Sequence, residues 1–154
     1  MDVFNLFAEH EWEGEQDRDG YRHRVTRIGA QLGAEQLGAS LYELPPGEGT
    51  FPYHYELGPE EWLLVVSGRP TLRTSDGERQ LSPGDVAVFP QGPAGGHKVT
   101  NATEETVRVV IFSSKTPLAV VAYPDSSKVG IWTREQGYVE LLRDEPKLDY
   151  WDGE

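Results

Sequence analysis

Short runs rich in Val, Thr and aromatic residues recur about every ten residues along this chain, separated by Gly and Pro. Long helical periodicity is missing. This pattern is typical of an all-β sandwich or barrel built from strands of about four to eight residues. The expected strands cover residues 22–28, 39–44, 52–56, 61–67, 70–75, 78–81, 85–90, 97–101, 106–113 and 118–123.

Two local features add detail to this pattern. Asp76-Gly77 lies between two expected strands, and Asp and Gly best fit the positive φ angles of a two-residue hairpin turn. We therefore expect a hairpin with Asp76 and Gly77 as its turn residues. The segment 132–144 predicts a short helix, which Gly137 would interrupt.

Length and composition limit the possible functions. A chain of 154 residues favours one domain around one core. Its net charge of −12 repels phosphate backbones and anionic membranes, so neither nucleic acid nor a membrane is an expected partner. The chain has no Cys, which excludes disulfides, thiolate metal sites and a Cys nucleophile. The N-terminus has no basic region followed by an apolar stretch, so we expect a cytoplasmic protein.

Residues 52–62, PYHYELGPEEW, gather many ionisable groups next to an apolar run. Side chains alternate along a strand, so His54 and Glu56 would share one face. The Gly and Pro of LGPE at 57–60 predict a hairpin connection, after which strand 61–67 would return antiparallel and bring Glu61 beside the first pair. A register shift of one residue would instead place Glu60 there.

Two carboxylates on one apolar face need compensation. Each charged group costs several kcal/mol when it leaves water, and the two repel each other. Without a cation, at least one of Glu56 and Glu61 should have a raised pKa, whereas a divalent ion would remove both penalties. These residues could equally be surface groups or ion-pair partners, so the cluster alone leaves both interpretations open.

Further along the chain, His97 ends a glycine-rich stretch, and here the sequence resembles the cupin superfamily. The positions that match the first cupin motif are Gly47, His54, Glu56, Glu61 and Gly68. The positions that match the second are Gly84, Pro90, Gly92, His97 and Asn101. The spacings from Gly47 to His54 and from Gly92 to His97 are longer than the usual motifs, and Glu56 stands where the family usually has a second His.

The resemblance covers roughly residues 39–123 and implies a double-stranded β-helix, the jelly-roll barrel of cupins. The whole chain, 1–154, is then one cupin domain with peripheral arms at 1–38 and 124–154. The resemblance also implies a metal site, whose ligands would be His54, Glu56, Glu61 and His97. This set of two imidazoles and two carboxylates suits one divalent transition metal, Mn, Fe, Co, Ni or Zn.

The resemblance is poor evidence for a reaction, because cupins host many unrelated functions. We expect a metal-dependent enzyme that acts on a small organic molecule, such as a dioxygenase or other oxidoreductase, an isomerase, a decarboxylase or a lyase. The alternatives are a non-catalytic protein that binds or senses a small ligand, and a dimeric scaffold with an empty pocket. The residues do not decide whether the site is catalytic.

Strand parity also predicts the surroundings of the metal. It places Pro52, Leu63, Val65 and Val99 in the lining of a small, mostly apolar pocket. Three aromatic residues should face away from the ion and pack between sheets or at a dimer contact: Tyr53, Tyr55 and Trp62. A further set could face an anionic substrate or the acidic surface of a second subunit in a homodimer: Arg22, Arg24 and Arg27.

Overall fold

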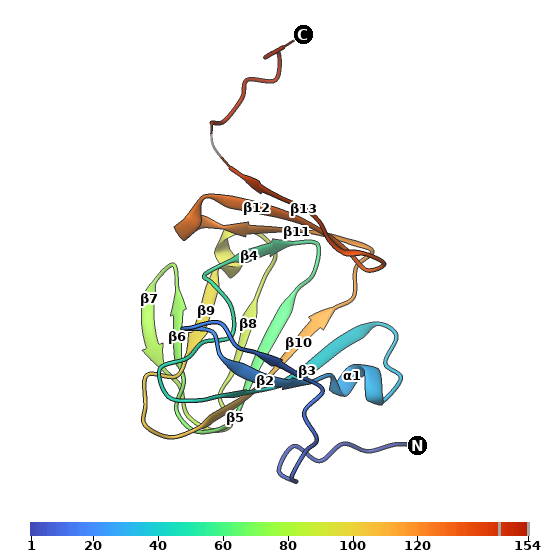
Figure 1. Ribbon diagram of the computed structural model, residues 1–154, viewed down its shortest axis with the longest axis vertical. Helices are drawn as coiled ribbons and strands as arrows, with labels where there is room; N and C mark the ends of the chain where they lie inside the picture. Colours follow the sequence, from blue (N-terminus) through green and yellow to red (C-terminus); the bar gives the residue numbers. More distant parts are fainter. Residues whose placement is uncertain (145, 154) are drawn as a thin grey trace.

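Antiparallel strands form nearly all of the regular structure of the protein, for which a computed structural model describes residues 1–144 and 146–153 (Figure 1). Residues 145 and 154, both in the expected C-terminal arm, lie outside the described residues. The strands are β1 (Gly14–Gln16), β2 (His23–Thr26), β3 (Leu37–Leu44), β4 (Tyr55–Leu57), β5 (Glu61–Ser67), β6 (Thr71–Thr74), β7 (Gly77–Gln80), β8 (Val86–Phe89), β9 (His97–Thr100), β10 (Val107–Ser114), β11 (Leu118–Tyr123), β12 (Lys128–Thr133) and β13 (Gly137–Arg143). The helices are short: α1 (Ile28–Gln31), η1 (Pro93–Gly95) and η2 (Pro124–Ser126).

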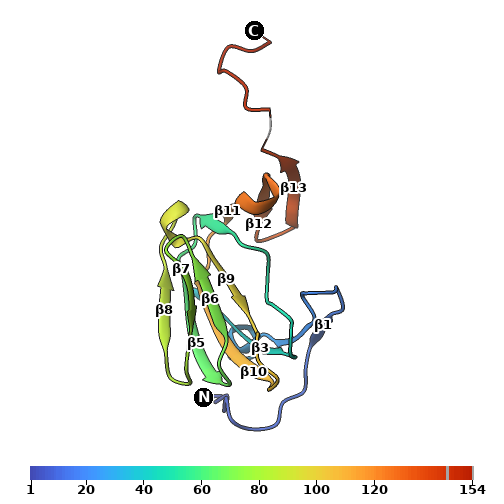
Figure 2. The ribbon, with the colours of Figure 1, turned by 90° about the vertical axis from the view of Figure 1, so that its left-hand side faces the viewer.

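The strands form three sheets. A six-stranded sheet has the order β1-β2-β3-β10-β5-β8, a four-stranded sheet the order β13-β12-β11-β4, and a three-stranded sheet the order β7-β6-β9. Together they make a jelly-roll barrel, which confirms the all-β expectation. The hairpin β12–β13 lies across one end of this barrel (Figure 2). In the described part of the chain, no helix is long and apolar enough to cross a membrane.

Alternation along β5 shows how the sequence fills the barrel. Leu63 and Val65 are fully buried and pack with Val99 and Val109 in the main core. Trp62, between the inward positions, points outward and is 46% exposed. Burying side chains of this size stabilises the fold by about 1.5–3 kcal/mol each.

The N-terminal arm packs against the outer face of the six-stranded sheet. Phe4, Leu6 and Trp12 lie against a second cluster of buried apolar residues that includes Leu41 and Val110. Strand β2 then pairs with β3 and extends the sheet. The first 38 residues therefore contribute two strands, β1 and β2, and an apolar cover.

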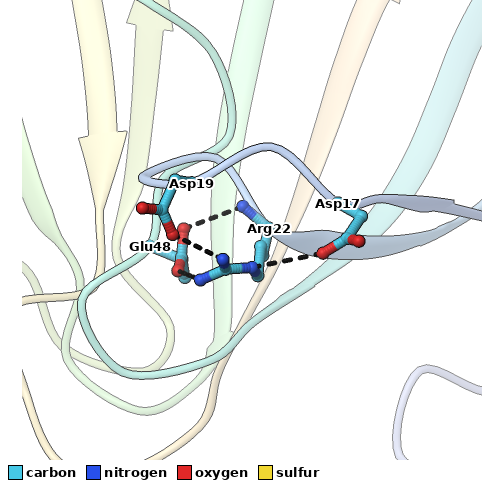
Figure 3. A network of polar contacts seen from close by, with 4 residues as sticks. All are labelled: Asp17, Asp19, Arg22 and Glu48. Atoms are coloured by element: carbon cyan, nitrogen blue, oxygen red, sulfur yellow. Dashed lines mark hydrogen bonds and ion pairs between the residues drawn. The ribbon is translucent and has the colours of Figure 1, made fainter.

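An ion-pair network holds the connection between β1 and β2 against the loop that precedes β4 (Figure 3). The Arg22 guanidinium contacts Asp17 at 3.2 Å, Asp19 at 2.5 Å and Glu48 at 3.0 Å. The backbone N–H of Arg22 also donates to Glu48, at 2.8 Å. Arg22 thus has carboxylate partners within its own chain, and its contact with a substrate or a second subunit stays a prediction.

The other two arginines of that set are also paired internally. Arg24 contacts the buried Glu43 carboxylate, which Arg108 approaches at 2.8 Å from the opposite side. Arg27 lies 3.8 Å from Glu13.

Each expected strand corresponds to a strand of the structure, but three local predictions were wrong. Residues 132–144 form most of the β12–β13 hairpin instead of a helix, because Gly137 has the positive φ of a turn (72°). The expected hairpin is confirmed, because β6 pairs antiparallel with β7, but its turn residues are 75–76, and of Asp76 and Gly77 only Gly77 has a positive φ (118°). Strand β4 pairs with β11 whereas β5 pairs with β10 and β8, so these consecutive strands do not form a hairpin.

Candidate metal centre

His54 and His97 lie side by side in an isolated β-bridge just before β4 and at the start of β9. The backbone N–H of His54 donates to the His97 carbonyl at 3.1 Å, and the reverse bond measures 2.9 Å. Their ring centroids are 4.6 Å apart. The pairing of two segments distant in sequence therefore places both imidazoles in one site.

The two rings are fixed in the same way. Each Nδ1 lies 2.9 Å from a carbonyl oxygen two residues earlier, that of Pro52 for His54 and that of Gly95 for His97. A carbonyl can only accept, so Nδ1 carries the proton and Nε2 keeps its lone pair. Phe89 stacks on the His97 ring at a centroid distance of 3.6 Å. Both Nε2 atoms are thereby oriented as metal ligands.

Glu61, the first residue of β5, supplies the third ligand atom. Its Oε2 lies 3.8 Å from His54 Nε2 and 3.6 Å from His97 Nε2, and the three ligand atoms are all within 4.8 Å of one another. These separations are too long for hydrogen bonds. Ligand bonds of about 2.0–2.2 Å keep neighbouring ligand atoms about 3–3.5 Å apart, so the three atoms would move closer together to share an ion.

The charge state of the cluster also fits a cation. Burial raises the pKa of the Glu61 carboxyl, and the nearby Glu56 raises it further. Burial lowers the pKa of both imidazoles, and it holds that of His97 at about 3, with help from His54. The imidazoles are therefore neutral near pH 7, as metal binding requires, and a divalent ion would stabilise the ionised carboxylate.

The structure separates the two glutamates that compete for this position. Glu60 points outward, accepts a hydrogen bond from Trp62 Nε1 at 2.9 Å and is exposed. Glu61 points into the site. The sequence-based preference for Glu61 therefore has the correct register.

Glu56, on β4, is not part of the three-residue group, although it lies close by. It lines the same cavities as Glu61, and burial raises the pKa of its carboxyl. Among the described residues, three of the four expected ligands are thus brought together, and Glu56 borders them.

Two connected cavities open from this cluster. The larger, of about 300 Å³, extends from Glu56 and Glu61 towards the β12–β13 hairpin. The smaller, of about 190 Å³, lies on the His54 side. They share five residues as common walls: Glu56, Glu61, Ser113, Val121 and Tyr138. This total space suits a small molecule.

The cavity walls differ from the residues expected to form them. Pro52, Leu63, Val65 and Val99 line neither cavity, and the last three are fully buried in the core. Leu63 and Val65 share the inward face of Glu61, as parity predicted, but they lie deeper in the barrel. Parity gives the face of a residue and not its depth.

The C-terminal hairpin supplies walls that the sequence did not reveal. Trp132, Arg134 and Tyr138 all line the larger cavity. Gly130 makes room for this arrangement, because a Cβ at that position would lie 2.6 Å from the Tyr138 ring. Residues 138–143, YVELLR, do not alternate between apolar and polar side chains, so no signal in the sequence indicated this strand.

Three further ring side chains pack against other residues of the fold: Tyr53, His10 and His23. Tyr53 is buried under the Arg73 guanidinium, which lies 4.3 Å from its ring. His10 stacks on Phe4, and His23 packs edge-on against Tyr42.

Comparison with known proteins agrees with this fold. The Cupin domain family matches residues 40–113, a range that contains His54, Glu56, Glu61 and His97. A search of curated proteins finds no match.

Several solved structures are similar. A sugar phosphate isomerase of the cupin superfamily from Silicibacter pomeroyi shares 28% identity, with a TM-score of 0.76 over 86% of this chain and 82% of the other. A protein from Acidithiobacillus ferrooxidans, provisionally given the same activity, shares 24% identity, with a TM-score of 0.76 over 84% and 82%. A Cupin 2 conserved barrel domain protein from Salinispora arenicola shares 17% identity, with a TM-score of 0.55 over 73% and 92%.

Proposed function

The chain belongs to the cupin superfamily, and on that basis we propose that it is a divalent-metal-dependent isomerase of a small hydroxycarbonyl compound. One observation carries the proposal: three ligand atoms converge within 4.8 Å at a cavity that a further carboxylate, Glu56, also lines. Such a cavity offers both a place for an ion and a group that can carry a proton.

His54, Glu61 and His97 would hold the ion. The neutral imidazoles and one carboxylate suit Mn, Fe, Co, Ni or Zn. When bound, such an ion supplies Lewis-acid polarisation of a substrate oxygen. The two imidazoles are buried and the Glu61 side chain is 15% exposed at the cavity, so an ion held there could still be reached by a substrate.

Glu56 would move the proton. Isomerisation of a hydroxycarbonyl compound removes a proton from the carbon that bears the hydroxyl group and returns one to the former carbonyl carbon. A second proton moves between the two oxygens, so atoms and charge balance without an oxidant. Glu56 lines the cavity outside the three-ligand group, so its carboxylate can serve as the general base that accepts the first proton and then returns it. This role replaces the ligand role that the sequence suggested.

The comparisons support an isomerase more than the other expected reactions. The Silicibacter pomeroyi protein, a sugar phosphate isomerase, resembles this chain over most of both lengths. An isomerase needs no oxygen and no redox change at the metal, and it uses the free carboxylate that Glu56 provides.

The test combines metal analysis with an isomerase assay. Purified protein should contain about one divalent metal per chain and should interconvert an aldose and a ketose in a panel of free and phosphorylated sugars. In D₂O the product should carry deuterium at the carbon that was the carbonyl, to the extent that the proton exchanges with solvent. A metal-loaded protein that is stabilised by a sugar but never converts one would instead be a ligand-binding protein.

The homodimer and the cytoplasmic location expected from the sequence remain predictions. Exposed apolar side chains on the outer face of the barrel support a dimer: Trp62, Val86 and Val88 lie on neighbouring strands and are 46%, 57% and 49% exposed. Light scattering of the purified protein would measure the assembly state.

A further inference from the structure

The larger cavity has two chemically different ends. Glu56 and Glu61 line the end next to the metal ligands, whereas Lys115 and Arg134 line the other. Lys115 and Arg134 also border a second, outer hollow, which Glu135 lines but Glu56 and Glu61 do not. The two cations therefore lie towards the mouth of the cavity.

Backbone hydrogen bonding within the chain brings these two cations together from separate segments. Lys115 follows β10, and Arg134 follows β12. The backbone N–H of Arg134 donates to the Pro117 carbonyl at 3.2 Å, which fastens one segment to the other. The Lys115 ammonium donates to the Ala34 carbonyl, which holds the ammonium in place. The ammonium keeps two further N–H donors.

Neither cation has a carboxylate partner among residues 1–144 and 146–153. Among the described residues, five arginines form ion pairs, and Arg18, Arg69, Arg79 and Arg143 are unpaired like Arg134: the paired ones are Arg22, Arg24, Arg27, Arg73 and Arg108. Ser114 and Thr116 add hydroxyl groups to the same wall. The Ser114 Oγ accepts the backbone N–H of Glu60 at 2.9 Å, which leaves its own proton available to donate.

We propose that Lys115 and Arg134 bind the phosphate group of a phosphate-monoester substrate. The inference rests on the proposed function and adds the substrate class and its orientation. Two cations and the nearby hydroxyl groups match a doubly charged group with three terminal oxygens better than they match a carboxylate. With the phosphate at the mouth, the carbonyl end of the molecule points towards Glu56 and the metal ligands.

The test is calorimetric titration of the full-length protein with ribose 5-phosphate, ribose, ribonate and inorganic phosphate. Ribose 5-phosphate should bind at least about tenfold more tightly than ribose or ribonate, because charge-assisted hydrogen bonds contribute more than the 1.4 kcal/mol that a factor of ten requires. Inorganic phosphate should compete with it. Equal affinity for ribonate, or no preference for the phosphate ester over ribose, would overturn the inference.

Variants locate the binding group. Lys115→Gln and Arg134→Gln should each weaken ribose 5-phosphate binding about tenfold and leave ribose binding unchanged. Arg79→Gln, on the exposed strand β7, removes the same charge away from the cavity and should change affinity less than twofold. Arg134 is exposed, so Arg134→Gln should keep the wild-type melting temperature. It therefore tests the inference even if Lys115→Gln disturbs the fold by losing the contact with Ala34. Unchanged affinity in the Arg134→Gln variant would overturn the inference.

Failure of this inference can be told apart from failure of the proposed function. The titrations are repeated on protein stripped of metal with EDTA and on Glu61→Gln, where phosphate recognition should persist without turnover. Isomerase activity with equal affinities in all variants would keep the proposed function and overturn the phosphate site. Phosphate binding that depends on Arg134, without isomerase activity, would keep the phosphate site and overturn the proposed function.

Discussion

His54 and His97 are joined by a backbone hydrogen bond in each direction, and this pairing sets their Nε2 atoms 3.8 and 3.6 Å from the same Glu61 oxygen. The two imidazoles are thus positioned by the barrel itself and not by a long flexible loop. A site held in this way is preorganised, so the ion would bind without the cost of ordering its ligands.

Glu61→Gln should abolish stoichiometric metal binding. The amide keeps the shape of the side chain but removes the negative charge, and two neutral imidazoles remain. Elemental analysis should fall from about one divalent ion per chain to a small fraction of that. Glu60→Gln is the matched control, since Glu60 faces outward, and it should keep the full metal content.

Glu56→Gln should keep the metal and lose turnover. Glu56 lies outside the three-ligand group, so under the proposed function its carboxylate would serve proton transfer and not the ion. We expect kcat to fall by about 10²–10⁴-fold, while metal content stays near that of wild type. A variant that loses its metal would show that Glu56 is the fourth ligand, as the sequence suggested.

Metal stabilisation should increase with pH. In the metal-free protein the pKa of Glu61 is raised above its ordinary value of 4.5, so the folded state holds a proton that the unfolded chain releases. The stability this gives is complete below that ordinary value and is lost as pH rises through the raised one. An added ion must displace the proton, so the increase in Tm with Mn²⁺ should be larger at pH 8 than at pH 6. Scanning fluorimetry measures Tm with and without Mn²⁺ at each pH. A Mn²⁺-dependent increase in Tm that is smaller at pH 8 than at pH 6 would contradict the assignment of Glu61 as a ligand.

Gly95→Ala should weaken metal binding without removing any ligand. A Cβ at residue 95 would lie 1.8 Å from the Pro90 carbonyl oxygen, so the loop must move, and the Gly95 carbonyl accepts the bond from His97 Nδ1. Loss of an orienting partner of this kind typically costs 10–100-fold in metal affinity. Gly14→Ala, whose Cβ would meet only ordinary contacts, should leave the affinity unchanged.

Glu43→Gln should destabilise the fold. Burial alone would raise the pKa of the Glu43 carboxyl, but Arg24 and Arg108 lower it overall. The stability from this ionised group is therefore present above about pH 4.5 and lost as pH falls. Because both arginines are partly exposed, we expect a loss of about 1–3 kcal/mol in the free energy of unfolding. Urea denaturation at pH 7 measures it.

The control for this variant is Glu78→Gln on the exposed strand β7, which should change stability by less than about 0.5 kcal/mol. The difference between Glu43→Gln and the wild type should shrink when both are measured near pH 4. A difference that grows on acidification would contradict the assigned ion pairs.

Strands could be predicted from this sequence because their signal is local. Residues 61–67 alternate between outward and inward side chains, and β5 has those bounds. The partner of each strand was harder to predict. LGPE at 57–60 resembles a hairpin turn, yet β4 and β5 separate into different sheets, because pairing is decided by which strands bury their faces together.

The candidate metal ligands could be predicted for a different reason. His54, Glu61 and His97 match ordered motif positions, and the structure brings them together. The cavity walls had no such pattern. Arg134 and Tyr138 reach the site through pairing between β11, β12 and β13, which no spacing along the chain encodes.

The hairpin that closes the cavity begins beyond residue 113, where the match to the Cupin domain family ends. Under the proposed function, the matched range would hold the ion, whereas the substrate would contact both that range and the hairpin that follows it. Exchange of Lys128–Arg143 for the equivalent hairpin of another cupin should change substrate preference and leave the identity of the bound metal unchanged.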